Sequence, residues 1–165
     1  MERNWSYTIP EGEHKGEVLW SGRYCCVCAI VACKVGDKIY ILANRRATPD
    51  FQGFWNMPCG FIECSETGEQ AASREVYEET GVFIYPERFN FYSVETDPTV
   101  SNNAHVTLYF IAQLKRATLP SVVIDYDECT DATWIPISEI HTYDWAFHHE
   151  ELIEDIIEEN ELYCD

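Results

Sequence analysis

Three glutamates near the middle of the chain, Glu75, Glu78 and Glu79, have the spacing of residues on one face of a helix. Like charges at this spacing repel each other, so a cation bound between them would stabilise the helix. Mg²⁺ suits such a site, because it prefers carboxylate oxygens, keeps several waters and is completed by substrate phosphates. Arg74 stands beside the group and could pair with Glu66 across the preceding loop. On their spacing alone, the three glutamates also fit a solvated acidic helix face.

The wider pattern around these glutamates is far more specific. It resembles the Nudix box: glycine, five residues, glutamate, seven residues, arginine-glutamate, an aliphatic residue, any residue, two glutamates, any residue, glycine and an aliphatic residue. Residue types have frequencies of a few per cent each, so a chance match is on the order of 10⁻⁸ to 10⁻⁹ per window. The similarity to the family extends over most of the chain. The matching positions are Gly60, Glu66, Arg74, Glu75, Val76, Glu78, Glu79, Gly81 and Val82.

The resemblance implies a role for each charged residue of the box. Glu75 and Glu79 would be the main ligands of Mg²⁺, with Mn²⁺ as a substitute, and Glu78 would bind directly or through water. Arg74 would orient Glu75, and Glu66 would hold Arg74. Divalent ions polarise phosphoryl oxygens and lower the pKa of bound water, which is the chemistry that cleavage of a pyrophosphate bond needs.

The chain departs from the family at Cys59, which precedes Gly60 where many members have two glycines. The family often uses the carbonyl of that first residue as a metal ligand, so the resemblance adds Cys59 to the expected ligands. Cysteine tolerates a positive φ poorly, and we therefore expect a different local backbone. The general base is left open among Glu79, Glu95 and Glu128.

Substrate contacts are expected from the segment before the box. Arg45 and Arg46 end a predicted strand near the expected phosphate position, with a surface ion pair as the alternative. Phe54 is a candidate for stacking on a base, and packing on the core is its alternative. Pro98, sixteen residues after Val82, is similar to a proline found in many ADP-ribose and nucleotide-sugar hydrolases of the family.

These features favour a Mg²⁺-dependent hydrolase that cleaves the pyrophosphate bond of a nucleoside diphosphate linked to another moiety. ADP-ribose or a nucleotide sugar is the favoured substrate, and a nucleoside triphosphate comes next. The alternative is a non-catalytic Nudix-like module that senses a nucleotide. Such modules tend to lose box glutamates or to carry a DNA-binding domain. This chain keeps the glutamates and has little length for a second domain, so an enzyme is expected.

The elements that must position these residues follow from periodicity and turn signals. A helix is predicted from Ser65 or Thr67 to Thr80, with Gly81 as its stop. A second, amphipathic helix is predicted over about residues 145–161. Apolar or alternating runs separated by turns predict strands over residues 25–33, 38–46, 83–97, 103–115 and 133–135.

This pattern predicts an α+β protein with the Nudix fold, an α/β/α sandwich around a mixed sheet. The order and direction of the strands come from the resemblance alone. We expect residues 1–22 to form an N-terminal arm and residues 23–165 to form one Nudix domain. A homodimer made through that arm is a further expectation.

Composition narrows the partners and the location. The net charge of −18 disfavours binding to nucleic acid or to an anionic membrane surface, because both need cations opposite their phosphates. An anionic small molecule can bind only where metal ions or a basic patch offset the field. The chain has no apolar run of membrane-spanning length and no signal-peptide pattern at its start, so we expect a cytoplasmic protein.

The eight cysteines are expected to be reduced thiols, most of them small core residues. A zinc site is the alternative, but it needs a second cysteine pair at knuckle spacing. His105, His148 and His149 are interpreted as solvated or core histidines, since they lack ligand spacing with partners.

Overall fold

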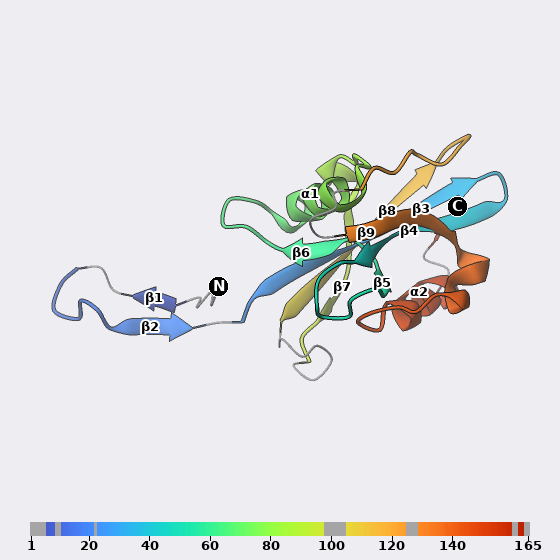
Figure 1. Ribbon diagram of the computed structural model, residues 1–165. Helices are drawn as coiled ribbons and strands as arrows, with labels where there is room; N and C mark the ends of the chain where they lie inside the picture. The colour runs from blue at the N-terminus through green and yellow to red at the C-terminus, as the bar shows by residue number, and fades with distance from the viewer. Residues whose placement is uncertain are drawn as a thin grey trace.

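The computed structural model describes residues 6–8, 11–21, 23–97, 105–124, 129–159 and 162–163. Near the N-terminus, β1 (Ser6–Thr8) and β2 (Val18–Ser21) form an antiparallel two-stranded sheet. Figure 1 shows this hairpin set apart from the sheet that forms the body of the molecule. The segment expected to be an arm is therefore a hairpin where it is described.

The body is built on a seven-stranded mixed sheet. Its continuous path is β5-β4-β3-β8-β7, while β6 pairs with β3 and β9 pairs with β4. β3 and β8 are parallel, and the other pairs are antiparallel. The strands are β3 (Cys25–Val35), β4 (Lys38–Arg46), β5 (Trp55–Asn56), β6 (Cys59–Phe61), β7 (Asn90–Glu95), β8 (Val106–Lys115) and β9 (Cys129–Pro136).

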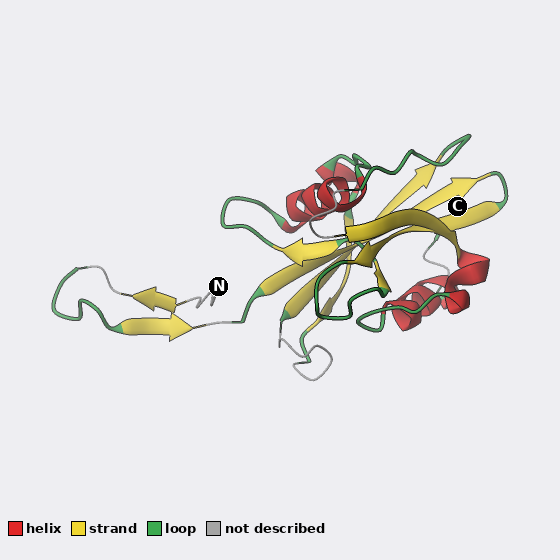
Figure 2. Cartoon of the chain, in the orientation of Figure 1, coloured by secondary structure: helices red, strands yellow, loops and turns green. Residues whose placement is uncertain are grey.

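Two helices cover the two faces of this sheet, as Figure 2 shows. Alternate residues of β3 separate two apolar clusters, because successive side chains of a strand point to opposite faces. Val27, Ala29 and Val31 pack with the apolar side of α1 (Gly68–Thr80), whereas Cys28, Ile30 and Ala32 pack with that of α2 (His149–Glu158). The predicted α/β/α sandwich is confirmed, and the continuous apolar run of β3 is explained by burial on both faces.

The box helix begins and ends where its capping residues predict. Thr67 accepts a hydrogen bond from the N–H of Gln70, whose side chain accepts one from the N–H of Thr67. Gly81 has a φ of 70° and donates its N–H to the carbonyl of Tyr77, 2.8 Å away. The glycine permits the left-handed turn that ends the helix.

Several predicted boundaries are wrong, among them the start of the strand predicted at residue 133, which begins at Cys129. The strand predicted from residue 83 begins only at Asn90, because Pro86 opens a short 3₁₀ helix, η1 (Pro86–Arg88). The last helix begins at His149, since Phe147 and His148 both have a positive φ and cannot belong to it. A second 3₁₀ helix, η2 (Ile137–Thr142), follows β9. Among the described helices, none combines the length and apolarity needed to span a bilayer.

Candidate active site

A cavity of about 1030 Å³ opens beside the N-terminal half of β3 and collects most of the residues singled out from the sequence. Its walls come from α1, from strands β3, β4, β6, β7 and β8, and from the loop before α2. The expected site residues that line it are Arg46, Cys59, Gly60, Arg74, Glu75, Glu78, Glu79 and Glu95.

Glu75 and Glu79 are the buried carboxylates of this cavity, each only 6% exposed. One oxygen of Glu79 accepts the backbone N–H of Cys59 at 3.2 Å. Glu75 accepts a hydrogen bond from Arg74 at 2.6 Å. Glu78 is half exposed and binds the same guanidinium nitrogen at 3.0 Å. The helical spacing thus brings three carboxylates to one wall, and each of them accepts a hydrogen bond from Arg74 or from the backbone N–H of Cys59.

Arg74 connects the helix to the preceding loop. Its guanidinium donates two hydrogen bonds to Glu66, at 2.6 and 3.1 Å, and one to the carbonyl of Phe61 at 2.9 Å. The expected pairing with Glu66 is therefore confirmed. The hydrogen bonds from Arg74 lower the pKa of Glu66, and those to Glu66 and then Glu75 raise the pKa of Arg74. One guanidinium thus bonds to Glu66 and Phe61 before the helix and to Glu75 on the helix.

The backbone at Cys59 and Gly60 is an extended strand paired with β3. Neither residue has a positive φ, so a side chain at Cys59 causes no conflict with the backbone. Gly60 is needed for another reason. A β-carbon added there would overlap the carboxylate of Glu75. The glycine lets α1 bring this carboxylate directly against β6.

The donor set of the cavity fits a hard divalent cation. Six carboxylates and two arginines lie among its described lining residues. Two of those carboxylates are nearly buried, and burial of charge is costly unless opposite charge compensates it. Carboxylate oxygens are the ligands that Mg²⁺ and Mn²⁺ prefer. Glu75, Glu78 and Glu79 could hold such an ion, and Cys59 is among the lining residues as well.

Comparison with known proteins agrees with this arrangement. The family model for the NUDIX domain matches residues 26–156, which is most of the chain. The chain belongs to the Nudix family.

Two Nudix relatives are similar in sequence over part of their length. An ADP-ribose pyrophosphatase of Methanocaldococcus jannaschii is 31% identical over 120 residues, 72% of this chain and 66% of the relative. The NAD-capped RNA hydrolase NudC of Haemophilus influenzae is 39% identical over 109 residues, 66% of this chain and 38% of the relative. The matched region thus spans just under two thirds of the first relative and well under half of the second.

Two solved structures share the fold. The NUDIX domain of Shewanella oneidensis NrtR, complexed with ADP ribose, has a TM-score of 0.75 at 23% identity, covering 86% of this chain and 90% of that chain. A Francisella tularensis bifunctional NMN adenylyltransferase/ADP ribose pyrophosphatase, complexed with AMP and a Mn ion, has a TM-score of 0.73 at 26% identity, covering 86% and 43%. The predicted Nudix fold is thus confirmed.

The residues expected to contact substrate separate into two groups. Arg46 lines the Nudix cavity, and its guanidinium lies 4.6 Å from the ring centre of Phe147. Arg45 instead donates to the carbonyl of Gly53, and Phe54 packs edge-on against Phe51; neither is among the lining residues. Of the three candidates, only Arg46 lines the cavity.

Two expected residues lie outside the described part of the chain. Glu128, one candidate for the general base, and Pro98, the proline connected with substrate class, both belong to undescribed segments. Of the three candidate bases, Glu79 and Glu95 line the cavity.

Phe147 and His149 are cavity residues that sequence reasoning did not assign to the site. His149 is buried, accepts the N–H of Met57 at Nδ1 (3.0 Å) and directs Nε2 at the sulfur of Cys28, 3.7 Å away. Burial lowers its pKa to about 3, and Arg46 and His148 add to the shift. Its interpretation as a core histidine is confirmed, but no local signal places it beside the cavity.

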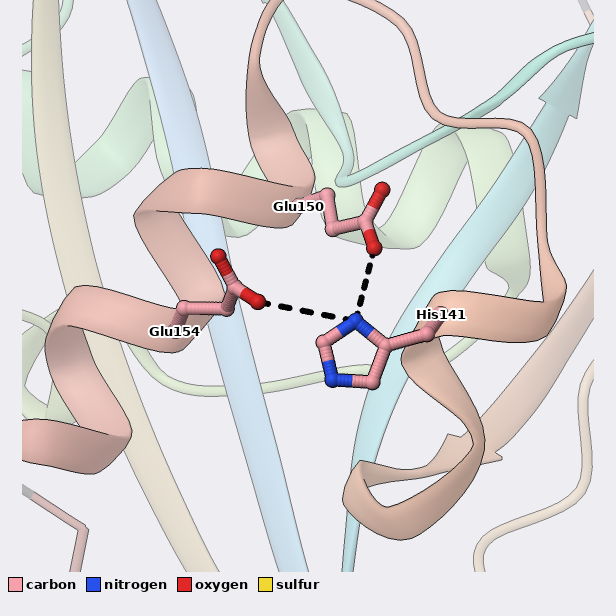
Figure 3. Close-up of side chains that lie close together, drawn as sticks. All are labelled: His141, Glu150 and Glu154. Carbon is pink, nitrogen blue, oxygen red and sulfur yellow. Dashed lines mark hydrogen bonds and ion pairs between the residues drawn. The ribbon is translucent and has the colours of Figure 1, made fainter.

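A second group of possible metal ligands lies on the α2 side, outside the cavity lining (Figure 3). His141 in η2 directs Nδ1 between two glutamates one turn apart on α2, at 2.8 Å from Glu150 and 3.5 Å from Glu154. All three side chains are a third or more exposed. These contacts account for the cluster as a surface ionic network.

Proposed function

We propose that this protein is a Mg²⁺-dependent pyrophosphohydrolase that cleaves a nucleoside diphosphate linked to another moiety. The observation that carries the proposal is the pair of nearly buried glutamates, Glu75 and Glu79, fixed by Arg74 and by the N–H of Cys59 on the wall of a large cavity. Names of relatives support the same activity, since the relative from Methanocaldococcus jannaschii is called an ADP-ribose pyrophosphatase.

The charge of the cavity determines how a substrate would enter. With six carboxylates among its lining residues, the cavity repels a diphosphate unless cations are present. Glu75, Glu78 and Glu79 would hold Mg²⁺ or Mn²⁺, and the carbonyl of Cys59 would complete the protein ligands. When bound, the metal supplies charge neutralisation of phosphate oxygens and a water of lowered pKa.

The remaining residues would bind and orient. Arg46 would donate to a phosphate oxygen opposite the metal ligands, as a guanidinium pairs well with phosphate. Arg74 would keep the carboxylate of Glu75 in place through its bonds to Glu66, which is a positioning role. Glu79 or Glu95 would accept the proton of the attacking water; both line the cavity.

The favoured substrate is ADP-ribose or a nucleotide sugar, with a nucleoside triphosphate next. A cavity of about 1030 Å³ is large enough for a nucleoside diphosphate carrying a second group. Two solved Nudix neighbours hold ADP ribose or AMP, and one of these also holds a Mn ion. The relative named as an NAD-capped RNA hydrolase adds NAD-linked substrates to those that need testing.

The test is product release from a nucleotide panel with Mg²⁺ or Mn²⁺, using the wild type, Glu79→Gln and Glu87→Gln. The panel contains ADP-ribose, nucleotide sugars, NADH, dinucleoside polyphosphates and nucleoside triphosphates. Glu79→Gln removes a proposed ligand and should lower kcat by about 10³-fold or more while the fold persists. Glu87→Gln removes an exposed carboxylate outside the cavity lining and should change nothing.

The outcomes separate an enzyme from a sensor. Turnover of one substrate class that is lost in Glu79→Gln and on chelation by EDTA supports the proposal and identifies the class. Near wild-type turnover by Glu79→Gln contradicts the metal assignment. Tight binding of one nucleotide with no turnover of any favours the non-catalytic sensing module.

A further inference from the structure

Two cysteines face each other across neighbouring strands in the wall of the cavity. Cys28 on β3 is the cross-strand partner of Cys59 on β6. Close to this pair, the N–H of Ala29 donates to the carbonyl of Pro58 (2.8 Å), and the N–H of Ile62 donates to that of Cys25 (3.1 Å). Hydrogen-bonded and non-hydrogen-bonded pairs alternate along an antiparallel ladder, so Cys28 and Cys59 form a non-hydrogen-bonded pair.

That position suits a disulfide. The Cα atoms of a non-hydrogen-bonded pair are about 4.5 Å apart, and disulfides join Cα atoms about 4.4 to 6.8 Å apart. The two side chains also point to the same face of the sheet. Both side chains border the same cavity, and the neighbouring Cys28 thiol lowers the pKa of Cys59.

The two thiols differ in access. Cys59 is half-buried and Cys28 is fully buried, although both border the cavity. Asn56 donates to the sulfur of Cys59 at 3.3 Å, and His149 lies 3.7 Å from the sulfur of Cys28. A small oxidant entering the cavity therefore meets Cys59 first, with Cys28 directly behind it.

The other cysteines on the cavity wall lack such a partner. Cys26 is the cross-strand partner of Phe61, and Cys64 is exposed in the loop after β6. Neither has a second cysteine opposite it in the ladder. These two thiols serve as matched controls for Cys28 and Cys59.

We propose that Cys28 and Cys59 form a reversible disulfide when the protein meets a peroxide, and that this linkage lowers activity. Hydrogen peroxide oxidises the Cys59 thiol to a sulfenic acid and is reduced to water. The Cys28 sulfur then attacks the sulfenic sulfur, forms the S–S bond and releases a second water. A dithiol such as dithiothreitol reduces the disulfide and is itself oxidised to a cyclic disulfide.

The effect on activity rests on the proposed function. Forming the bond brings the two free thiol sulfurs to about 2.05 Å from each other. Cys59 must shift toward β3, and its N–H is the donor that holds Glu79. Gly60, the next residue, packs against Glu75. Because a displacement of about 1 Å at a site can cost about 100-fold in rate, we expect turnover to fall at least tenfold.

The test treats the protein with hydrogen peroxide, alkylates the remaining thiols and maps the linked peptides by mass spectrometry. We expect a peptide pair joined through Cys28 and Cys59, together with a fall in turnover that dithiothreitol reverses. Cys28→Ser should abolish the linkage and leave a sulfenic acid at Cys59 that dimedone traps. Cys26→Ser and Cys64→Ser should still form the linkage.

Each result decides the proposal. No linkage at Cys28–Cys59, or a linkage through Cys26 or Cys64 instead, overturns it. A Cys28–Cys59 linkage with unchanged turnover overturns its regulatory part. If the reduced wild type hydrolyses no nucleotide, the proposed function fails, whereas the peptide map still reports whether the disulfide forms.

Discussion

Carboxylates gather in two places on this molecule, and their surroundings differ. In the cavity, Glu75 and Glu79 are each 6% exposed, and Arg74 and a backbone N–H hold them. On α2, the side chains of Glu150 and Glu154 are 33% and 43% exposed, and they share the imidazole of His141. Both groups stand one helical turn apart, so spacing alone does not distinguish them.

The difference lies in what each group costs the fold. A surface ionic network is surrounded by water and needs no further compensation. Buried carboxylates lose their hydration, so hydrogen-bond donors of the protein or a bound cation must replace the lost water. In the cavity the fold supplies a fixed arginine, a strand N–H and a glycine that admits the carboxylate of Glu75. Burial with fixed orientation, and not the number of acidic residues, therefore identifies the candidate metal site.

Among the variants that test this difference between the two carboxylate groups, Gly60→Ala should have the largest effect on activity. The added methyl group overlaps the carboxylate of Glu75, which must swing away from β6. We expect kcat for the substrate found in the panel to fall by about 100-fold, as a displacement of about 1 Å at a site can do. Stability should change by less than about 1 kcal/mol, because a side-chain carboxylate moves easily and alanine also restricts the unfolded chain.

Thermal unfolding with and without Mn²⁺ supplies the control for that variant. The wild type should gain stability from Mn²⁺, and Gly60→Ala should gain less, because its ligand set is displaced. Wild-type activity in a normally folded Gly60→Ala protein would show that the close packing of Glu75 on Gly60 has no catalytic importance.

Local rules account for the box helix and for its contact with the loop. The capping pair at Thr67 and Gln70, the stop at Gly81 and the pairing of Arg74 with Glu66 all follow from residues within one short stretch. The central strands follow from their apolar runs, and β4 (Lys38–Arg46) was predicted with the observed bounds. Such features depend on neighbours in sequence, which is why they could be predicted.

The rest of the site depends on residues that meet only in the folded chain. Cys28 and His149 are 121 positions apart in the sequence, and they meet because α2 packs on the face of the sheet to which Cys28 of β3 points. Phe147 and His148 adopt left-handed conformations that non-glycine residues rarely use. The amphipathic pattern of this segment instead predicted a helix that includes both residues. Here tertiary packing determines the backbone against local preference, so His149 and Phe147 could not be placed at the cavity in advance.

Burial of His149 beside the cavity should make the stability of the protein depend on pH. Its folded pKa of about 3 lies below the ordinary value near 6.5, so the unfolded chain binds a proton that the folded chain does not. Stability is therefore lost as pH falls through 6.5, and the loss ends near pH 3. Between pH 7 and 5 this residue should remove about 2 kcal/mol from the free energy of unfolding. Urea titrations at both pH values measure it.

Two asparagine variants isolate this contribution. In His149→Asn the side-chain oxygen can still accept the N–H of Met57, but no imidazole titrates, so most of the 2 kcal/mol difference should disappear. His148→Asn removes the neighbouring exposed histidine, and asparagine suits its left-handed backbone, so the wild-type difference should persist. If the free energy of unfolding changes equally with pH in all three proteins, His149 is not the source of the pH dependence.

The smallest effect is expected on α2. His141→Gln removes the imidazole that joins Glu150 and Glu154, and exposed pairs of this kind contribute about 0.2 to 1 kcal/mol. The free energy of unfolding should change by no more than this amount, and turnover should stay within about twofold of the wild type. Isothermal titration with Mn²⁺ gives the sharper readout, because the number of bound ions should be the same in both proteins. If His141→Gln loses one bound Mn²⁺, the exposed cluster is a metal site too, and burial ceases to separate the two groups of carboxylates.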